Sequence, residues 1–300
     1  MKKLILYLLM LGPVLGFCQP REWYTSLEAA KGLALVQNKM VLMMWEESAS
    51  FPFPVVINTS EGKSIYIDDL FQNEFVSNLI WEYFIPVKVS ESFYADMIEP
   101  VEAHQNQRYI DKFNDDSMKV LDANGNILNV YDTNDYYNFN MSKFIQKYGL
   151  NTSFLKGELL NYSKVNDYYS SYRLADKYIE FASYISEDLR KEIIELSTIY
   201  LEEAQRRLDE VSAENKPSYL LQLELLELKQ SLILNKPRRV LRLLKKMDTD
   251  QGKDFNQSLI DFLNYTAYGL LKDEDNASVW RSKLSLVNLK KANQIINSNL

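Results

Sequence analysis

The sequence has very little sulfur and almost no histidine: one cysteine, Cys18, and one histidine, His104, in 300 residues. A single thiol cannot close an internal disulfide, so a disulfide-stapled fold is excluded. A zinc or copper site needs two or more such ligands converging. No glycine-rich loop that could cradle a phosphate is present either. We therefore expect no metal and no cofactor, and we expect His104 to be a solvated helix residue.

Glycine and proline are also scarce, with nine and eight residues respectively, while 46% of the residues are hydrophobic and 13% are aromatic. A chain of this composition can bury a substantial core, which excludes a largely disordered protein. At about 100 to 200 residues per domain, the length predicts two domains.

Basic residues are outnumbered, 34 against 41 acidic ones, for a net charge of −7. Such a surface repels nucleic acid and anionic membranes, and no basic patch interleaved with aromatics offsets it. No stretch of the chain approaches the roughly 18 consecutive apolar residues that a membrane-spanning helix needs. We expect neither a nucleic-acid partner nor an integral membrane segment.

The first 18 residues have the pattern of a secretory signal peptide. Lys2 and Lys3 precede an apolar run, and Gly16 and Cys18 stand as the small residues before a cleavage site. We therefore expect an exported protein, periplasmic or secreted. The alternative is cleavage before Cys18 with lipid attached to its thiol, but the bulky Phe17 disfavours a lipoprotein.

Residues 19–150 alternate between helical and extended patterns, which predicts an α/β sheet. Thr25 and Glu28 suggest a capping box for the first helix. Residues 55–69 fit either a hairpin or a broken helix, and residues 90–100 read as an acidic loop. The predicted helices span 22–38, 71–83, 101–113 and 141–148, and the predicted strands span 40–45, 84–89, 118–122 and 127–131.

Residues 151–300 read as almost pure helix. Leucines and other apolar residues recur at steps of three and four, for example from Leu189 to Tyr200 and from Leu221 to Leu232. Pro217 and Pro237 stand where a first-turn proline costs no hydrogen bond. The pattern predicts an all-α domain of antiparallel helical hairpins. The glycine, tyrosine and alanine spacing of a tetratricopeptide unit is absent, so the array is at most similar to such repeats.

The stretch KMVLMMWEESASFPFP, residues 39–54, organises the first half: a buried strand delivers a polar turn and two proline-spaced aromatics. Together with FIPVKV at 84–89 and VLDANGNIL at 120–128, it resembles the thioredoxin-like domains secreted by Bacteroidetes-type bacteria, over roughly residues 22–150. The resemblance implies a thioredoxin-like α/β sandwich with a reactive cysteine pair and a peptide-gripping cis-proline at one corner.

Both functional features of that family are missing here. The resemblance places the cysteine pair on Phe51 and Pro54, and the cis-proline near Asp116 and Ser117. Thiol–disulfide exchange needs a thiolate that attacks sulfur, and no other side chain replaces it. We therefore expect a redox-inactive domain, not an enzyme. The candidate site residues of this degenerate loop are Trp45, Phe51, Pro52, Phe53, Pro54, Asp116 and Ser117.

The aromatic rings of Phe51 and Phe53 allow two interpretations. They could form an apolar edge that docks a partner, or they could fill the space that an active-site helix would cover, which is the commoner fate of aromatic residues. The sequence as a whole favours a non-catalytic binding or scaffold protein with another envelope or secreted protein as its partner.

Two alternative functions stay open. One is an accessory role in oxidative folding, without electron transfer by this chain. The other is carbohydrate binding by the tyrosine-rich segments 131–139 and 166–172, whose tyrosines could equally pack a domain interface.

Overall fold

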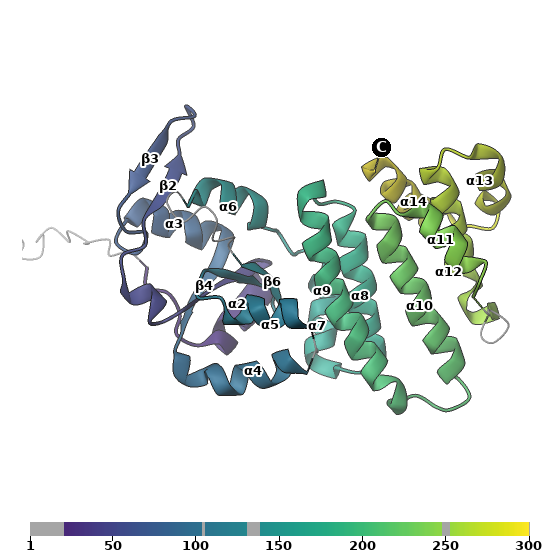
Figure 1. Cartoon of the computed structure of the whole chain (residues 1–300), viewed down its shortest axis with the longest axis horizontal. Coiled ribbons are helices and arrows are strands. Elements are labelled where there is room, and N and C mark those ends of the chain that lie inside the picture. Colours follow the sequence, from purple (N-terminus) through teal and green to yellow (C-terminus); the bar gives the residue numbers. More distant parts are fainter. Residues whose placement is uncertain (1–20, 104–105, 131–138, 248–252, 300) are drawn as a thin grey trace, which may run out of the picture.

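The computed structural model describes residues 21–103, 106–130, 139–247 and 253–299. It is a mixed α/β structure. A small sheet with its helices lies at one end, and the remaining helices follow one another toward the other end (Figure 1).

A four-stranded mixed sheet forms the centre of the first half. Its strand order is β4-β1-β5-β6, with β1 parallel to β4 and antiparallel to β5. All six side chains of β1 are buried, as expected for a continuous apolar run covered on both faces. The bounds of β1 and β4 are those predicted from the sequence, 40–45 and 84–89. The strands are β1 (Met40–Trp45), β4 (Phe84–Val89), β5 (Lys119–Leu121) and β6 (Ile127–Val130).

Helices of the first half of the chain pack around this sheet. Helix α2 packs on β1 and β4, α3 packs on β4, and α5 packs on β6. Asparagine side chains accept a hydrogen bond from the first turn of α3, α5 and α6, which satisfies a backbone N–H that the helix leaves unpaired. The helices are α2 (Leu27–Gln37), α3 (Glu74–Tyr83), α4 (Tyr94–Glu102), α5 (Gln107–Asn114) and α6 (Met141–Tyr148).

The segment 55–69 is a hairpin and not a broken helix. Strands β2 (Val55–Asn58) and β3 (Ser64–Ile67) pair antiparallel, and Gly62 takes a φ of 78° in their turn. The hairpin projects from the sheet half in Figure 1. Strand β3 is largely exposed, whereas Val55 and Ile57 of β2 are buried.

The predicted start of the first helix is wrong. Helix α2 begins at Leu27, and the capping side chain is Ser26, which accepts from Ala29 N, and not Thr25. Tyr24, two residues before this cap, pairs with β4 instead. Its N–H donates to Pro86 O at 3.1 Å, and its carbonyl accepts from Lys88 N at 2.8 Å. These edge hydrogen bonds hold residue 24 in an extended conformation, so the helix cannot extend back to it.

The predicted acidic loop at 90–100 is wrong as well. A short 3-10 turn, η2 (Glu91–Phe93), leads directly into α4, which tolerates Pro100 near its end. The predicted helix 101–113 is in turn divided, because α4 ends at Glu102 and Asn106 caps a separate α5.

The second half is an array of helices. Figure 1 shows α8 and α9 side by side next to the sheet half, followed by α10 and then α11 to α14. Pro217 lies in the first turn of α10 and Pro237 begins α11, as predicted. Between the two helices, Asn235 takes a left-handed conformation with a φ of 53°, which interrupts the helical backbone. The helices are α7 (Lys156–Val165), α8 (Tyr168–Ala182), α9 (Glu187–Arg206), α10 (Lys216–Ile233), α11 (Pro237–Leu244), α12 (Lys253–Leu270), α13 (Glu274–Arg281) and α14 (Leu286–Ser298).

A fully buried carboxylate, Asp122, joins the sheet to the helices. Its Oδ1 accepts the backbone N–H groups of Asn124 and Asn126, both at 2.9 Å, within the β5–β6 turn. Its Oδ2 accepts the hydroxyls of Tyr178 on α8, at 3.0 Å, and Tyr200 on α9. Burial raises the pKa of Asp122, and the four hydrogen bonds oppose that rise.

We predict that Asp122→Ala lowers the free energy of unfolding by about 3 to 5 kcal/mol, because it leaves two buried tyrosine hydroxyls and two backbone donors without an acceptor. Urea unfolding curves measure the loss. Asp116→Ala, at an exposed aspartate on the same half, is the matched control and should change stability by less than about 0.5 kcal/mol. Equal effects of the two substitutions would contradict the role assigned to Asp122.

Candidate functional site

The predicted site residues lie at one edge of the sheet, which we call the corner and define as residues 45–54, 90–94 and 115–117. Because β1 and β4 are parallel, their carboxyl ends meet at this edge, and β5 begins there, with Lys119 opposite Met43. The N–H of Glu47 donates to Glu91 Oε1 at 2.8 Å and ties two of the loops together. Carboxyl ends of parallel strands are a usual place for ligand sites.

Trp45 lies inside the corner, with 4% of its surface exposed. Its ring packs edge-on against Phe113, with 5.6 Å between centroids, and at a tilt against Tyr94, at 6.0 Å. Trp45 is therefore part of the core beneath the loops of the corner, and its ring is not accessible to a ligand.

The two phenylalanines of the loop divide between the two interpretations. Phe53 is half-buried and packs edge-on against Phe139, with 5.7 Å between centroids. Phe51 is 72% exposed, and Pro52 and Pro54 beside it are exposed too. Phe53 thus faces the core, whereas Phe51 faces solvent at the position where the resemblance places a cysteine.

The residues at the cis-proline position form an ordinary polar turn. Asp116 is exposed, and Ser117 donates its N–H to Asp115 Oδ1 at 2.7 Å. Every peptide bond in the described part of the chain is trans. The structure therefore brings Asp116 and Ser117 to the same edge as Trp45 and Phe51, but in a different backbone form from the family's.

A buried lysine, Lys119, completes the corner and was missed from the sequence. Its Nζ donates to the carbonyl oxygens of Asp115 and, at 3.4 Å, of Ser117, and lies 5.6 Å from the centroid of the Trp45 ring. Burial lowers its pKa to about 8, although the carboxylates of Asp115 and Asp116 oppose the shift. The available signal was a single charge within the apolar run 118–121.

We predict a pH dependence that Lys119→Met removes. Because the folded-state pKa lies below the unfolded value of 10.5, the unfolded chain binds more protons between about pH 8 and pH 10. The free energy of unfolding of the wild type should therefore rise relative to that of Lys119→Met by up to about 1.4 kcal/mol per pH unit near the middle of this window. Urea unfolding across the window measures the difference, with Lys143→Met as the control for loss of an exposed lysine. A constant difference would contradict the prediction.

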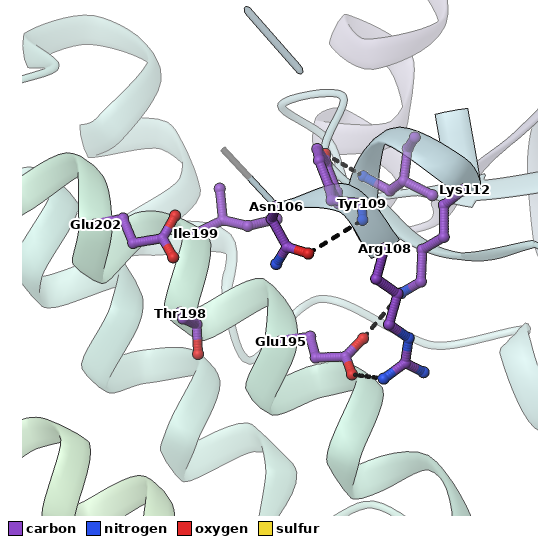
Figure 2. A pocket seen from close by; sticks show the side chains of 9 residues that line it. Asn106, Arg108, Tyr109, Lys112, Glu195, Thr198, Ile199 and Glu202 are labelled. Carbon is purple, nitrogen blue, oxygen red and sulfur yellow. Dashed lines mark hydrogen bonds and ion pairs between the residues drawn. The ribbon is translucent and has the colours of Figure 1, made fainter. Parts of the chain in front are cut away.

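A small pocket of about 180 Å³ lies between α5 of the sheet half and α9. Figure 2 shows Glu195 reaching from α9 toward Arg108 and Lys112. Glu195 Oε1 is 2.9 Å from Arg108 Nη1, and its Oε2 is 2.9 Å from Lys112 Nζ. Lys112 is buried and also donates to the carbonyl of Leu128 at 3.0 Å.

The chemistry of this pocket is that of a bridge. The carboxylate of Glu195 forms ion pairs with both Arg108 and Lys112 across the boundary between α9 and α5. Beside it, the hydroxyl of Tyr109 accepts a hydrogen bond from the N–H of Ile127 at 3.0 Å. Burial raises the pKa of the Tyr109 hydroxyl, which keeps it neutral. These ion pairs hold α5 against α9 and add to the hydrogen bonds of Asp122, which also join the sheet to the helices.

We predict that Glu195→Ala lowers the free energy of unfolding by about 2 kcal/mol, since it leaves the buried ammonium of Lys112 without its carboxylate. Arg108→Ala, which removes the exposed partner of the same carboxylate, should cost less than about 1 kcal/mol. Thermal or urea unfolding of both variants compares them directly. A larger loss in Arg108→Ala than in Glu195→Ala would contradict this assignment.

The tyrosine-rich segments behave differently from the expectation of an open loop. Residues 131–138 lie outside the described residues. In the other segment, Asn166 ends α7, Asp167 caps α8, and Tyr168 is buried. The hydroxyl of the more exposed Tyr169 pairs with that of Tyr219 on α10 at 2.6 Å. These tyrosines therefore pack α8 against α10 within the helical half.

Cys18 and His104 lie outside the described residues. In the described ranges no cluster of three or more histidine, cysteine, aspartate or glutamate side chains is placed to bind a metal ion. Nor does any helix in those ranges combine the length and apolar character needed to cross a membrane. Comparisons with protein-family models, with curated proteins and with solved structures each give no match to this chain.

Proposed function

We propose that this chain is an exported, non-catalytic binding protein: a redox-inactive thioredoxin-like domain in residues 19–150 docks a protein partner at the corner, and the helical domain in residues 151–300 serves as a scaffold. The observation that carries the proposal is Phe51, a large aromatic side chain that is 72% exposed at the position where the resemblance places a reactive cysteine.

The order of elements supports the thioredoxin-like assignment. A helix precedes the central strand β1, a loop and α3 lead to the parallel strand β4, further helices lead to the β5–β6 hairpin, and α6 follows. This is the order that the sequence resemblance implies. The β2–β3 hairpin lies between the corner loop and α3.

The chemistry of the corner supports a non-catalytic role. One cysteine in the whole sequence cannot supply a dithiol. Trp45 and Lys119 fill the interior beneath the loop, and the ammonium of Lys119 bonds to backbone carbonyls. We find no group at this edge, within the described residues, that could exchange electrons with a disulfide.

The surface of the corner indicates the kind of partner. Phe93 and Tyr94, in the loop and helix after β4, are 53% and 40% exposed. The loops of the corner also carry the exposed carboxylates Glu46, Glu47 and Asp116. Aromatic side chains contribute large contact area at low entropic cost, and complementary charge selects the partner. We therefore propose a partner surface with apolar anchors and lysine or arginine residues around them.

The test is a photo-crosslinking amino acid at position 51, used to capture partners from an envelope extract of the native host, followed by affinity measurement with the purified partner. We expect Phe51→Ser to weaken binding by about 30-fold, as for a central anchor, and the double change Glu46→Lys and Glu47→Lys to slow association. Leu286→Ser, at a residue that is 85% exposed on α14, is the matched control and should leave the affinity unchanged.

Three outcomes would count against the proposal. Phe51→Ser with unchanged affinity would remove the corner as the docking surface. Acceleration of insulin reduction by the purified, processed protein would overturn the non-catalytic assignment. Recovery of an oxidoreductase as the crosslinked partner would favour the accessory role in oxidative folding instead.

A further inference from the structure

A second candidate site lies far from the corner, in a cleft of about 660 Å³ between α11, α12 and α13. These helices lie at the opposite end of the molecule from the sheet (Figure 1). The floor of the cleft is one face of α12, and one wall is Trp280 at the end of α13. The site is independent of the proposed partner-binding corner.

The floor presents a row of acceptor oxygens. Gln257, Asp261 and Asn264 follow one another at steps of four and three residues, which places them on one face of α12. Gln257 Nε2 donates to Asp261 Oδ1 at 2.7 Å, and Asn264 Nδ2 donates to the carbonyl of Ile260 at 2.9 Å. Asp261 Oδ2 and Asn264 Oδ1 have no hydrogen-bond donor in the described part of the chain.

The two residues that carry these acceptors are largely buried, although the oxygens themselves are open to the cleft. Asp261 is 5% exposed and Asn264 is 9% exposed, and both line the cleft. Because neither oxygen is a buried atom without a partner, both are open to the cleft and available to a ligand. A ligand that supplies O–H or N–H groups along this row would satisfy them, so the floor favours a ligand rich in hydrogen-bond donors.

The walls supply aromatic faces and two cations. The rings of Trp280 and Tyr268 are half-buried at the cleft and contact no other aromatic ring among the described residues. Lys283 Nζ lies 4.3 Å from the centroid of the Trp280 ring, and Lys245 is exposed at the rim. Clefts that combine apolar rings with a few placed polar groups are typical small-ligand sites.

We propose that this cleft binds an oligosaccharide. Sugar hydroxyls can donate to the carboxylate and carboxamide oxygens of the floor and can accept from the lysine ammonium groups, while the C–H faces of sugar rings pack on the indole and phenol. The row from Gln257 to Asn264 rises about 10 Å along α12, enough for more than one sugar ring. An extended peptide fits less well, because each of its N–H groups is accompanied by a carbonyl and the floor offers that carbonyl few donors.

The experiment titrates the full processed chain by calorimetry with four probes: maltohexaose, cellohexaose, chitohexaose and hexagalacturonate. We expect at least one to bind. Trp280→Ala should weaken that binding at least tenfold by loss of ring contact, and Asp261→Asn should weaken it by about 10- to 100-fold, the range for a hydrogen bond to a charged group. Val279→Ala, on the same helix at an exposed position outside the cleft, is the matched control and should bind as the wild type does.

Because Asp261→Asn changes a buried residue and could disturb folding, a second variant changes only an exposed side chain. Lys283→Met should also change the affinity or the preference for the acidic probe. Binding that Trp280→Ala and Lys283→Met both leave unchanged would overturn the proposal. So would the absence of binding to all four probes, or tight binding of a peptide such as polyglutamate at this cleft in their place.

Discussion

The hydrogen bonds to the Asp122 carboxylate are the constraint on which the relation between sheet and helices depends. A charge without access to water is tolerated only when donors surround it, and here two donors come from the β5–β6 turn and two from the tyrosines of α8 and α9. Any rotation of the helices relative to the turn would separate hydroxyl from carboxylate. Tyr178 and Tyr200 also stack, with 5.5 Å between their ring centroids. The hydrogen bonds of their hydroxyls to Asp122 are therefore accompanied by an apolar contact between their rings.

The corner combines a filled interior with an exposed aromatic side chain. Trp45 and Lys119 occupy its interior, and the ammonium of Lys119 donates to the carbonyls of Asp115 and Ser117. In the loop before Phe51, the Ser50 hydroxyl donates to the carbonyl of Glu46 at 3.0 Å. Phe51 then extends from a supported base, which suits an anchor whose conformation is set before a partner arrives.

Much of the fold could be predicted from the sequence, and the reasons are local. The apolar runs 40–45 and 84–89 became β1 and β4, and Pro217 and Pro237 marked the starts of α10 and α11, because burial and backbone geometry act within a few residues. The error at residues 22–26 has a distant cause, since Tyr24 pairs with β4 some 60 residues later.

The candidate sites were less predictable for the same physical reason. The sequence identified Phe51 as exceptional but left its direction open, because core and surface aromatics look alike in a pattern. The partners of Asp122 are 56 and 78 residues away, and the cleft on α12 depends on α11 and α13 closing around it. The local sequence of Lys119 offered one signal, a single charge in an apolar run, but it did not show which carbonyls would accept hydrogen bonds from the ammonium.

The elongated stacking of the helices separates the two proposed sites by most of the length of the molecule (Figure 1). Occupancy of one would not obstruct the other, so a single chain could hold a protein at one end and a glycan at the other. A docked protein would then remain within a fixed radius of the sugar surface, and its local concentration there would rise without any direct contact between the two. In that arrangement the length of the helical array, more than either affinity, sets how far the tethered protein can reach.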